Sequence, residues 1–91
     1  MAEVVARLLR VRGHVQGVFF RDSVRGEAES RGVSGWAVNR PDGSVEVLLE
    51  GRPEHVQRLI EYCAHGPPGA RVAELDVSAH PPEGCSGFRV R

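Results

Sequence analysis

The sequence predicts an α+β fold in which two helices lie on one face of an antiparallel-type sheet. Two observations lead to this class. Some segments carry apolar residues at every second position, the period of a half-buried strand, and two others carry them every three or four positions, the period of an amphipathic helix. The chain has 91 residues, of which 41% are hydrophobic. That size suits one domain over residues 1–91 with a thin core.

The first strand is expected over residues 4–12. Val5, Leu9 and Val11 fall on one face of this segment, while arginines occupy much of the other. A polar side of this kind indicates a sheet with one face turned to water. Gly13 is expected to end the strand.

The first helix is predicted over residues 21–31. Phe20, Val24 and Ala28 recur at four-residue spacing and make a narrow apolar stripe. Gly32 follows in the position that favours a left-handed helix cap, so the helix is expected to stop there.

A hairpin is predicted next, with strands over residues 33–39 and 44–50. The turn between them, residues 40–43, reads Arg-Pro-Asp-Gly and combines the fixed φ of proline with the freedom of glycine. Trp36 and Val38 are two positions apart and therefore share a face of the sheet, which we expect to be the core face.

The second helix is expected to begin at Pro53, a residue that suits the first helical turn. The Gly-Pro-Pro-Gly run at residues 66–69 is expected to stop it. Its apolar stripe follows the i, i+3, i+4, i+7 pattern of an amphipathic helix and consists of Val56, Leu59, Ile60 and Cys63.

A further strand is predicted over residues 72–79, with Leu75, Val77 and Ala79 on its apolar face. Residues 88–91 are expected to add a short edge strand. The resulting order, β-α-β-β-α-β with a small final strand, is the ferredoxin-like split β-α-β arrangement. This fold carries many functions, so the function has to be argued from a site.

Charge and composition narrow the function classes. Twelve basic and twelve acidic residues cancel, which disfavours partners bound through bulk charge, such as nucleic acid or an anionic membrane. Every basic residue is arginine, so a lysine nucleophile is excluded. No apolar run reaches the ~20 residues of a membrane helix. No secretory signal is evident at the N-terminus, so the cytoplasm is the expected location.

The cysteines and histidines show no metal-binding or redox spacing. Cys63 and Cys85 are the only cysteines, and a disulfide between them is not expected without a secretory signal. We therefore expect neither a metal nor another cofactor.

Residues 13–21 form the candidate functional segment. Gly13 and Gly17 permit backbone angles that turn consecutive amides towards one point. The following helix start adds free N–H groups, and Arg21 can grip two oxygens of a phosphate. Two glycines alone also fit a tight connection beside an exposed arginine. Four apolar residues in so short a loop favour instead a water-poor cradle: Val15, Val18, Phe19 and Phe20.

Two blocks of sequence resemble one known family. Residues 13–21, GHVQGVFFR, are similar to the motif G-x-V-Q-G-V-x-[FY]-R of the acylphosphatase family. Residues 35–46, GWAVNRPDGSVE, resemble its second motif, G-[WY]-V-x-N-x-x-D-G-x-V-E. The resemblance extends over essentially the whole chain, including its length and order of elements.

This resemblance implies metal-free hydrolysis of the carboxyl–phosphate bond of acyl phosphates, of the carbamoyl phosphate or 1,3-bisphosphoglycerate type. A monomer is the natural expectation. The resemblance assigns phosphate binding to Arg21 and orientation of the attacking water to Asn39. It places the phosphate cradle on the eight residues before the arginine, which are Gly13, His14, Val15, Gln16, Gly17, Val18, Phe19 and Phe20.

The chain departs from the family pattern around the first helix. Arg31 and Ser23 stand where family members usually carry apolar or aromatic residues, which puts the packing of that helix in question. Asp22 follows Arg21 directly and could draw its guanidinium away from phosphate. Arg89 and Arg91 either add positive charge near the site or are solvated edge residues.

Three alternative functions remain at this stage. The domain could bind carbamoyl phosphate for a larger carbamoyl-transfer protein without catalysing hydrolysis. It could bind RNA, since RNA-recognition motifs share this element order, although five aromatic residues and no net charge disfavour that. Finally, Cys85 and Arg91 have the C-x5-R spacing of cysteine-dependent phosphatases, but the segment lacks the helix that would activate the thiol.

Overall fold

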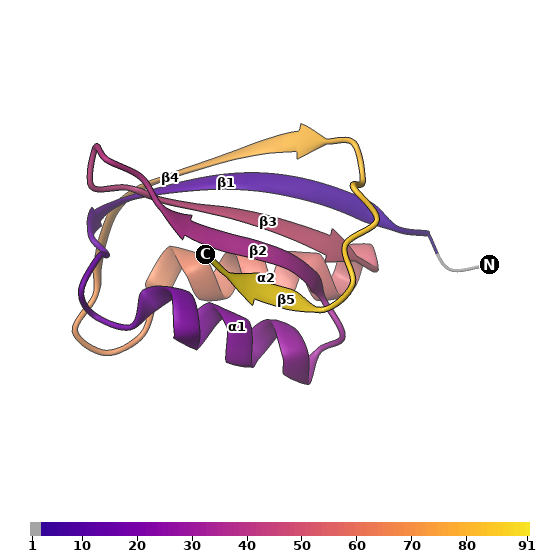
Figure 1. Cartoon of the computed structure of the whole chain (residues 1–91), viewed down its shortest axis with the longest axis horizontal. Coiled ribbons are helices and arrows are strands. Elements are labelled where there is room, and N and C mark those ends of the chain that lie inside the picture. The colour runs from indigo at the N-terminus through magenta and orange to yellow at the C-terminus, as the bar shows by residue number, and fades with distance from the viewer. Residues whose placement is uncertain (1–2) are drawn as a thin grey trace.

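The chain folds as a five-stranded sheet with both helices packed on one face, which confirms the predicted ferredoxin-like α+β class (Figure 1). The computed structural model describes residues 3–91. In chain order, the elements are β1 (Val5–His14), α1 (Phe20–Ser30), β2 (Ser34–Asn39), β3 (Val45–Gly51), α2 (Pro53–His65), β4 (Arg71–His80) and β5 (Phe88–Val90).

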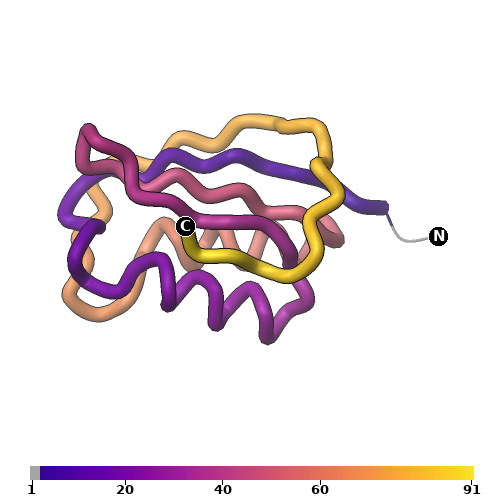
Figure 2. Tube along the Cα trace, in the orientation of Figure 1, coloured from indigo at the N-terminus to yellow at the C-terminus, as the bar shows by residue number. Residues whose placement is uncertain are grey.

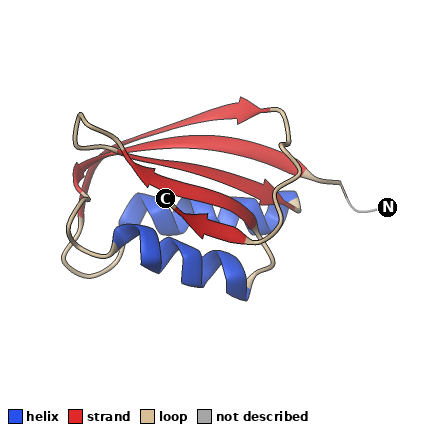
Figure 3. Ribbon diagram, in the orientation of Figure 1, coloured by secondary structure: helices blue, strands red, loops and turns tan. Residues whose placement is uncertain are grey.

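The strands lie in the order β4-β1-β3-β2-β5. β1 pairs antiparallel with β3 and β4, and β2 and β3 form the predicted antiparallel hairpin. β5 is the exception, because it returns along the sheet edge and pairs parallel with β2 (Figure 3). It also contacts α1, so the end of the chain lies at the sheet edge beside this helix (Figure 2).

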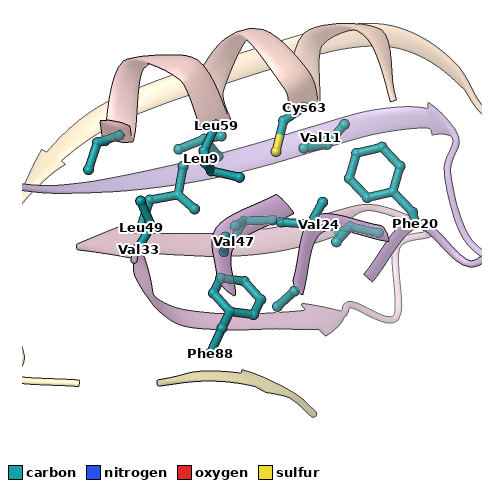
Figure 4. Packing of buried hydrophobic residues seen from close by; sticks show 14 of the residues in the cluster. Leu9, Val11, Phe20, Val24, Val33, Val47, Leu49, Leu59, Cys63 and Phe88 are labelled. Atoms are coloured by element: carbon teal, nitrogen blue, oxygen red, sulfur yellow. The ribbon is translucent and has the colours of Figure 1, made fainter. Parts of the chain in front are cut away.

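The main core lies between the sheet and the helices (Figure 4). Phe20, Val24 and Ala28 of α1 are fully buried, as the four-residue spacing predicted. α2 begins at Pro53 as expected and buries most of its predicted stripe against the same sheet face. Full burial of a large apolar side chain such as valine, leucine or phenylalanine stabilises the fold by roughly 1.5–3 kcal/mol. That residues 1–91 form a single domain stays a prediction.

The prediction that Trp36 and Val38 face the main core is wrong. They do share a face, but it is the face opposite the helices, where Trp36 packs with Ala6 and Leu48 in a second, smaller cluster. Ala37, between them, is the residue of β2 that enters the main core. The period-2 pattern shows which side chains share a face, whereas the direction of that face depends on the strand pairing.

The apolar face predicted for β4 is largely exposed. Leu75 packs against the main core, but Val77 is 44% exposed and Ala79 is also exposed. β4 is an edge strand that pairs only with β1 among the described residues. The alternation therefore correctly predicted a strand but not its burial.

The end of β1 and the start of α1 also differ from the predictions. β1 continues through Gly13 to His14, and its pairing with β4 shifts register between Arg12 and Gly13. This irregularity carries the strand past the glycine that was expected to end it. α1 begins one residue earlier than expected, at Phe20, and ends before Gly32, whose φ is +68°.

Candidate active site

A pocket of about 270 Å³ opens where β1 gives way to α1. It is built from the loop after β1, the first turn of α1 and the end of β2. Both residues predicted to be catalytic, Arg21 and Asn39, lie in it although they are separated by 18 positions in the sequence. The lining residues are Val15, Gly17, Phe19, Phe20, Arg21, Asp22 and Asn39.

Two buried side chains hold the loop in place. Val15 and Phe20 are both 1% exposed and belong to the main core, where Figure 4 shows the Phe20 ring beside the strands. Gly17 lies between them with φ +77°, a conformation that favours glycine. The core therefore fixes the loop at both ends, and Gly17 between them is exposed.

Of the four apolar residues predicted to line the cradle, Val15, Phe19 and Phe20 line the pocket and Val18 does not. Val15 and Phe20 serve the core, Val18 is partly buried against it, and Phe19 is 81% exposed. Val15 and Phe20 therefore also anchor the loop to the main core. The polar side chains that line the pocket are those of Arg21, Asp22 and Asn39.

The first turn of α1 borders this pocket. The first bond of the helix joins the Ser23 N–H to the Phe19 carbonyl at 3.0 Å. The N–H groups of residues 20–22 precede that bond and are not used by the helix itself. Together with the helix dipole they make the helix start favourable for an anion.

Arg21 is half-buried and carries the positive charge of the pocket. Its guanidinium donates a hydrogen bond to the main-chain oxygen of Arg91. Within residues 3–91 it forms no ion pair with an Asp or Glu side chain.

The residues that depart from the family pattern form interactions with nearby side chains. Asp22 pairs with Arg25 at 3.3 Å, so its carboxylate is directed along the helix instead of towards Arg21. The hydroxyl groups of Ser23 and Tyr62 are hydrogen-bonded and join α1 to α2. Arg31 is exposed beyond the helix end and pairs with Glu27 at 3.7 Å.

Asn39 ends β2, where it pairs in register with Val45 of β3. Its Oδ1 atom is buried and has no hydrogen-bond partner among residues 3–91. A buried acceptor without a partner is uncommon in folded proteins and is costly unless a donor occupies the adjacent space. Asn39 also lines the pocket.

Gln16 has a different place from the one implied for it. Its Nε2 donates to the carbonyl oxygens of Arg40 and Ser44, at 2.8 and 2.9 Å. It thus ties the loop to the β2–β3 hairpin that carries Asn39. Of the predicted cradle residues, four are not among those lining the pocket: Gly13, His14, Gln16 and Val18.

Two parts of the site were not predicted from the sequence. They are Asp22 as a lining residue of the pocket and the main-chain oxygen of Arg91 as the acceptor for Arg21. The sequence indicates only that Asp22 follows Arg21 directly, and its local pattern does not predict the ion pair with Arg25. The Arg91 oxygen is a backbone atom, so no residue type signals its role. Only the chain path of β5 brings it to α1.

A charge cluster stabilises the hairpin on the open face of the sheet. Glu46 pairs with Arg40 and with Arg10, the latter at 3.4 Å. Partial burial raises the pKa of Glu46, but the hydrogen bonds and charges of Arg40 and Arg10 outweigh burial and hold the pKa below its ordinary value. The hydrogen bonds from Ser44 likewise lower the pKa of Asp42 in the turn.

The cysteine-phosphatase alternative does not fit the structure. Burial, together with the Glu50 and Glu83 carboxylates, raises the pKa of the Cys85 thiol, the reverse of what a nucleophile needs. The Arg91 guanidinium lies 4.9 Å from the centroid of the Trp36 ring in a cation–π contact. Cys63 and Cys85 are both free thiols.

One group of potential metal ligands lies away from the pocket among the described residues, and consists of Glu50, Glu83 and Cys85. The Glu50 carboxylate already accepts hydrogen bonds from the N–H groups of Glu83 and Cys85, the latter at 3.0 Å. The indole N–H of Trp36 donates to Glu83 at 3.2 Å. These contacts hold residues 83–85 over the open face of the sheet.

Fold and pocket together define a small α+β protein with an arginine and a helix start at one pocket. The chain belongs to the acylphosphatase family, whose family model matches residues 8–90. An acylphosphatase of Aeropyrum pernix is 56% identical over 90 residues, covering 97% of this chain and 88% of the relative. An acylphosphatase of Gloeobacter violaceus is 49% identical over 90 residues, covering 99% of this chain and 97% of the relative.

A solved structure gives the same result. The acylphosphatase from Coxiella burnetii superimposes with a TM-score of 0.92 at 39% identity, covering 97% of this chain and 93% of that one. The predicted family and the predicted enzyme class, acylphosphatase, are therefore confirmed. A non-catalytic carbamoyl phosphate-binding module is not favoured, because the similar proteins named acylphosphatase match over nearly their whole length. None of the described helices has the length and apolar character needed to span a membrane.

Proposed function

We propose that this enzyme hydrolyses the carboxyl–phosphate bond of acyl phosphates by in-line attack of water, with Arg21 and the loop before it holding the phosphate. One observation carries the proposal. Arg21, which has no Asp or Glu partner among the described residues, borders the same pocket as the first turn of α1 and Asn39. The Oδ1 of Asn39 has no hydrogen-bond partner among those residues.

Arg21 and the first amides of α1 supply the phosphate-binding groups. The guanidinium offers two parallel N–H donors in a fork that fits two oxygens of a phosphate. The helix start adds main-chain donors and a partial positive charge. As charge shifts on the phosphoryl oxygens during transfer, donors already in place stabilise the transition state without reorganisation.

Asn39 is proposed to orient the attacking water. Its Oδ1 can accept a hydrogen bond from that water, and a neutral amide does not repel the phosphate as a carboxylate would. The water then attacks phosphorus as the P–O bond to the acyl group breaks, giving a carboxylate and inorganic phosphate. A carboxylate is a good leaving group, so positioning and charge stabilisation suffice for the reaction.

No histidine is proposed as a general base. His14 is exposed at the end of β1 and is not among the residues lining the pocket. The substrate phosphate itself is proposed to take the proton from water. Small acyl phosphates of the carbamoyl phosphate or 1,3-bisphosphoglycerate type are the proposed substrates, and the enzyme is proposed to act as a cytoplasmic monomer.

Hydrolysis of benzoyl phosphate in the presence of EDTA tests the proposal. We expect rapid turnover by the wild type. Arg21→Gln removes the phosphate fork, and Asn39→Ala removes the acceptor for water, so each is expected to lower kcat by at least about 100-fold. Circular dichroism establishes that both variants are folded.

His14→Ala is the matched control, because it changes a loop neighbour that does not line the pocket. It is expected to keep the turnover and pH profile of the wild type. A folded wild type without turnover would contradict the proposal. So would a pH profile with a steep limb near the pKa of histidine that disappears in His14→Ala.

A further inference from the structure

Phe19 is a pocket residue whose side chain takes no part in the proposed reaction. It lines the same pocket as Arg21 and Asn39, yet the residue is 81% exposed, more than the other large apolar residues described. Its backbone belongs to the loop, and its carbonyl accepts the first hydrogen bond of α1. The ring itself contributes nothing to the main core.

The backbone of Phe19 is in an unfavourable conformation. With φ 59° and ψ 28° it is the one non-glycine residue of residues 3–91 that has a positive φ. A Cβ atom is disfavoured in this left-handed region. Val15 and Phe20, buried on either side, impose the turn.

A phenylalanine here combines a disfavoured backbone with an apolar ring in water. A glycine would avoid both. Single exposed apolar residues are common on protein surfaces and need no explanation. The combination of exposure, backbone strain and a place in the pocket is what singles out Phe19, because such strain gathers at ligand-binding sites.

We propose that the Phe19 ring contacts the acyl group of the substrate and makes the site favour acyl phosphates with an aromatic or apolar acyl group. This inference rests on the proposed function. An acyl phosphate has one charged end and one variable end. With the phosphate on Arg21 and the start of α1, the variable end is directed to the pocket rim, where the ring is the large apolar surface available.

The size of the effect follows from aromatic contact energies. A well-placed pair of aromatic rings corresponds to roughly a 3- to 10-fold change in an equilibrium or rate constant beyond simple area burial. A methyl group, as in acetyl phosphate, offers little surface to the ring. The ratio of kcat/KM for benzoyl phosphate to that for acetyl phosphate is therefore the quantity that Phe19 controls.

The experiment measures this ratio for the wild type, Phe19→Ala and Phe19→Tyr. Phe19→Ala is expected to lower it about 3- to 10-fold, and Phe19→Tyr, which keeps an aromatic ring, is expected to preserve it. The inhibition constant for inorganic phosphate is expected to change less than about twofold in both variants, because phosphate lacks an acyl group. Val77→Ala, a truncation of an exposed residue on β4 outside the pocket, is expected to leave the ratio unchanged.

An unchanged ratio in folded Phe19→Ala overturns the inference. So does an equal loss for both substrates together with weaker inhibition by phosphate, since Phe19 would then only shape the phosphate loop. If Phe19→Ala does not fold, Phe19→Leu gives the same test, because leucine lacks the aromatic ring but is larger than alanine. A wild type that hydrolyses neither substrate contradicts the proposed function instead.

Discussion

The guanidinium of Arg21 donates a hydrogen bond to the main-chain oxygen of Arg91, a residue 70 positions further along the chain. The N–H of Arg91 donates in turn to the carbonyl of Ala37 at 2.9 Å, two residues before Asn39. Arg91 thus connects the start of α1 with the end of β2, the two elements that carry the proposed catalytic side chains.

Removing Arg91 is expected to raise KM about tenfold, because a hydrogen bond to a charged group contributes about 1.5–3 kcal/mol and part of it is recovered through water. A chain that stops at Val90 moves its last oxygen by about one residue, ~3.3 Å along the strand. Steady-state kinetics with benzoyl phosphate measures the change.

Arg91→Ala separates the main chain from the side chain. It keeps the main-chain oxygen and loses only the cation–π contact with Trp36. Its KM is expected to stay within about threefold of the wild type, since an exposed cation–π pair contributes about 0.5–1 kcal/mol. Equal effects of the two changes would assign the role to the guanidinium of Arg91 instead.

Gln16→Ala is expected to lower both stability and activity. The substitution removes the amide that bridges the loop to the carbonyls of Arg40 and Ser44. Loss of these bonds is expected to cost about 1–2 kcal/mol of unfolding free energy, measured in urea. Because the bridge also positions the loop against the hairpin bearing Asn39, kcat is expected to fall.

Gln16→Glu supplies the isosteric control for that prediction. It retains the shape but replaces the donating amide with a carboxylate that faces two carbonyl oxygens. It should therefore be at least as destabilising as Gln16→Ala. A Gln16→Glu variant with wild-type stability would show that the two hydrogen bonds contribute nothing.

Gly13 and Gly17 are expected to respond differently to alanine. A Cβ on Gly13 would lie 2.1 Å from the Arg71 carbonyl oxygen in β4, whereas a Cβ on Gly17 would meet nothing within 4 Å. Gly13→Ala is thus expected to cost more than about 3 kcal/mol of stability. Gly17→Ala is expected to cost about 1–2 kcal/mol through its positive φ alone.

Urea denaturation compares the unfolding free energies of the two variants, and steady-state kinetics measures the activity of Gly17→Ala, which is expected to stay folded. Because Gly17 lines the pocket, its alanine variant is expected to lose activity out of proportion to its stability. Similar unfolding free energies for both variants would contradict the close approach of β1 to β4 at Gly13.

Cys63 is expected to make stability fall at alkaline pH. Burial raises the pKa of its thiol from the ordinary 9.0 to about 12. The folded protein therefore keeps the thiol protonated while the unfolded chain loses the proton above pH 9. The stabilisation is complete below pH 9 and falls by about 1.4 kcal/mol per pH unit as the pH rises towards the folded pKa.

The measurement is urea denaturation of wild type and Cys63→Ala at several values between pH 8 and pH 11. Other alkaline titrations are common to both proteins and cancel in the difference. The stability advantage of the wild type is expected to shrink as the pH rises. An advantage that stays constant over this range would contradict the prediction.

Local patterns were enough to predict the order of the elements. The stripe of Phe20, Val24 and Ala28 specifies one buried helix face, and the structure buries all three. The motif around Gly17 and Arg21 lies at the predicted junction of strand and helix. Such features depend on residues within a few positions of each other, which is why a single sequence contains them.

What the sequence by itself determined is therefore the class of the fold, the two helix stripes and the family. The tertiary structure decided the rest: Trp36 lies on the open face, Val77 is exposed at the edge, and Phe19 is exposed at the pocket. It also brought the Arg91 oxygen to Arg21. The physical reason is that periodicity groups side chains by face, whereas the environment of each face is set by pairing between strands distant in sequence.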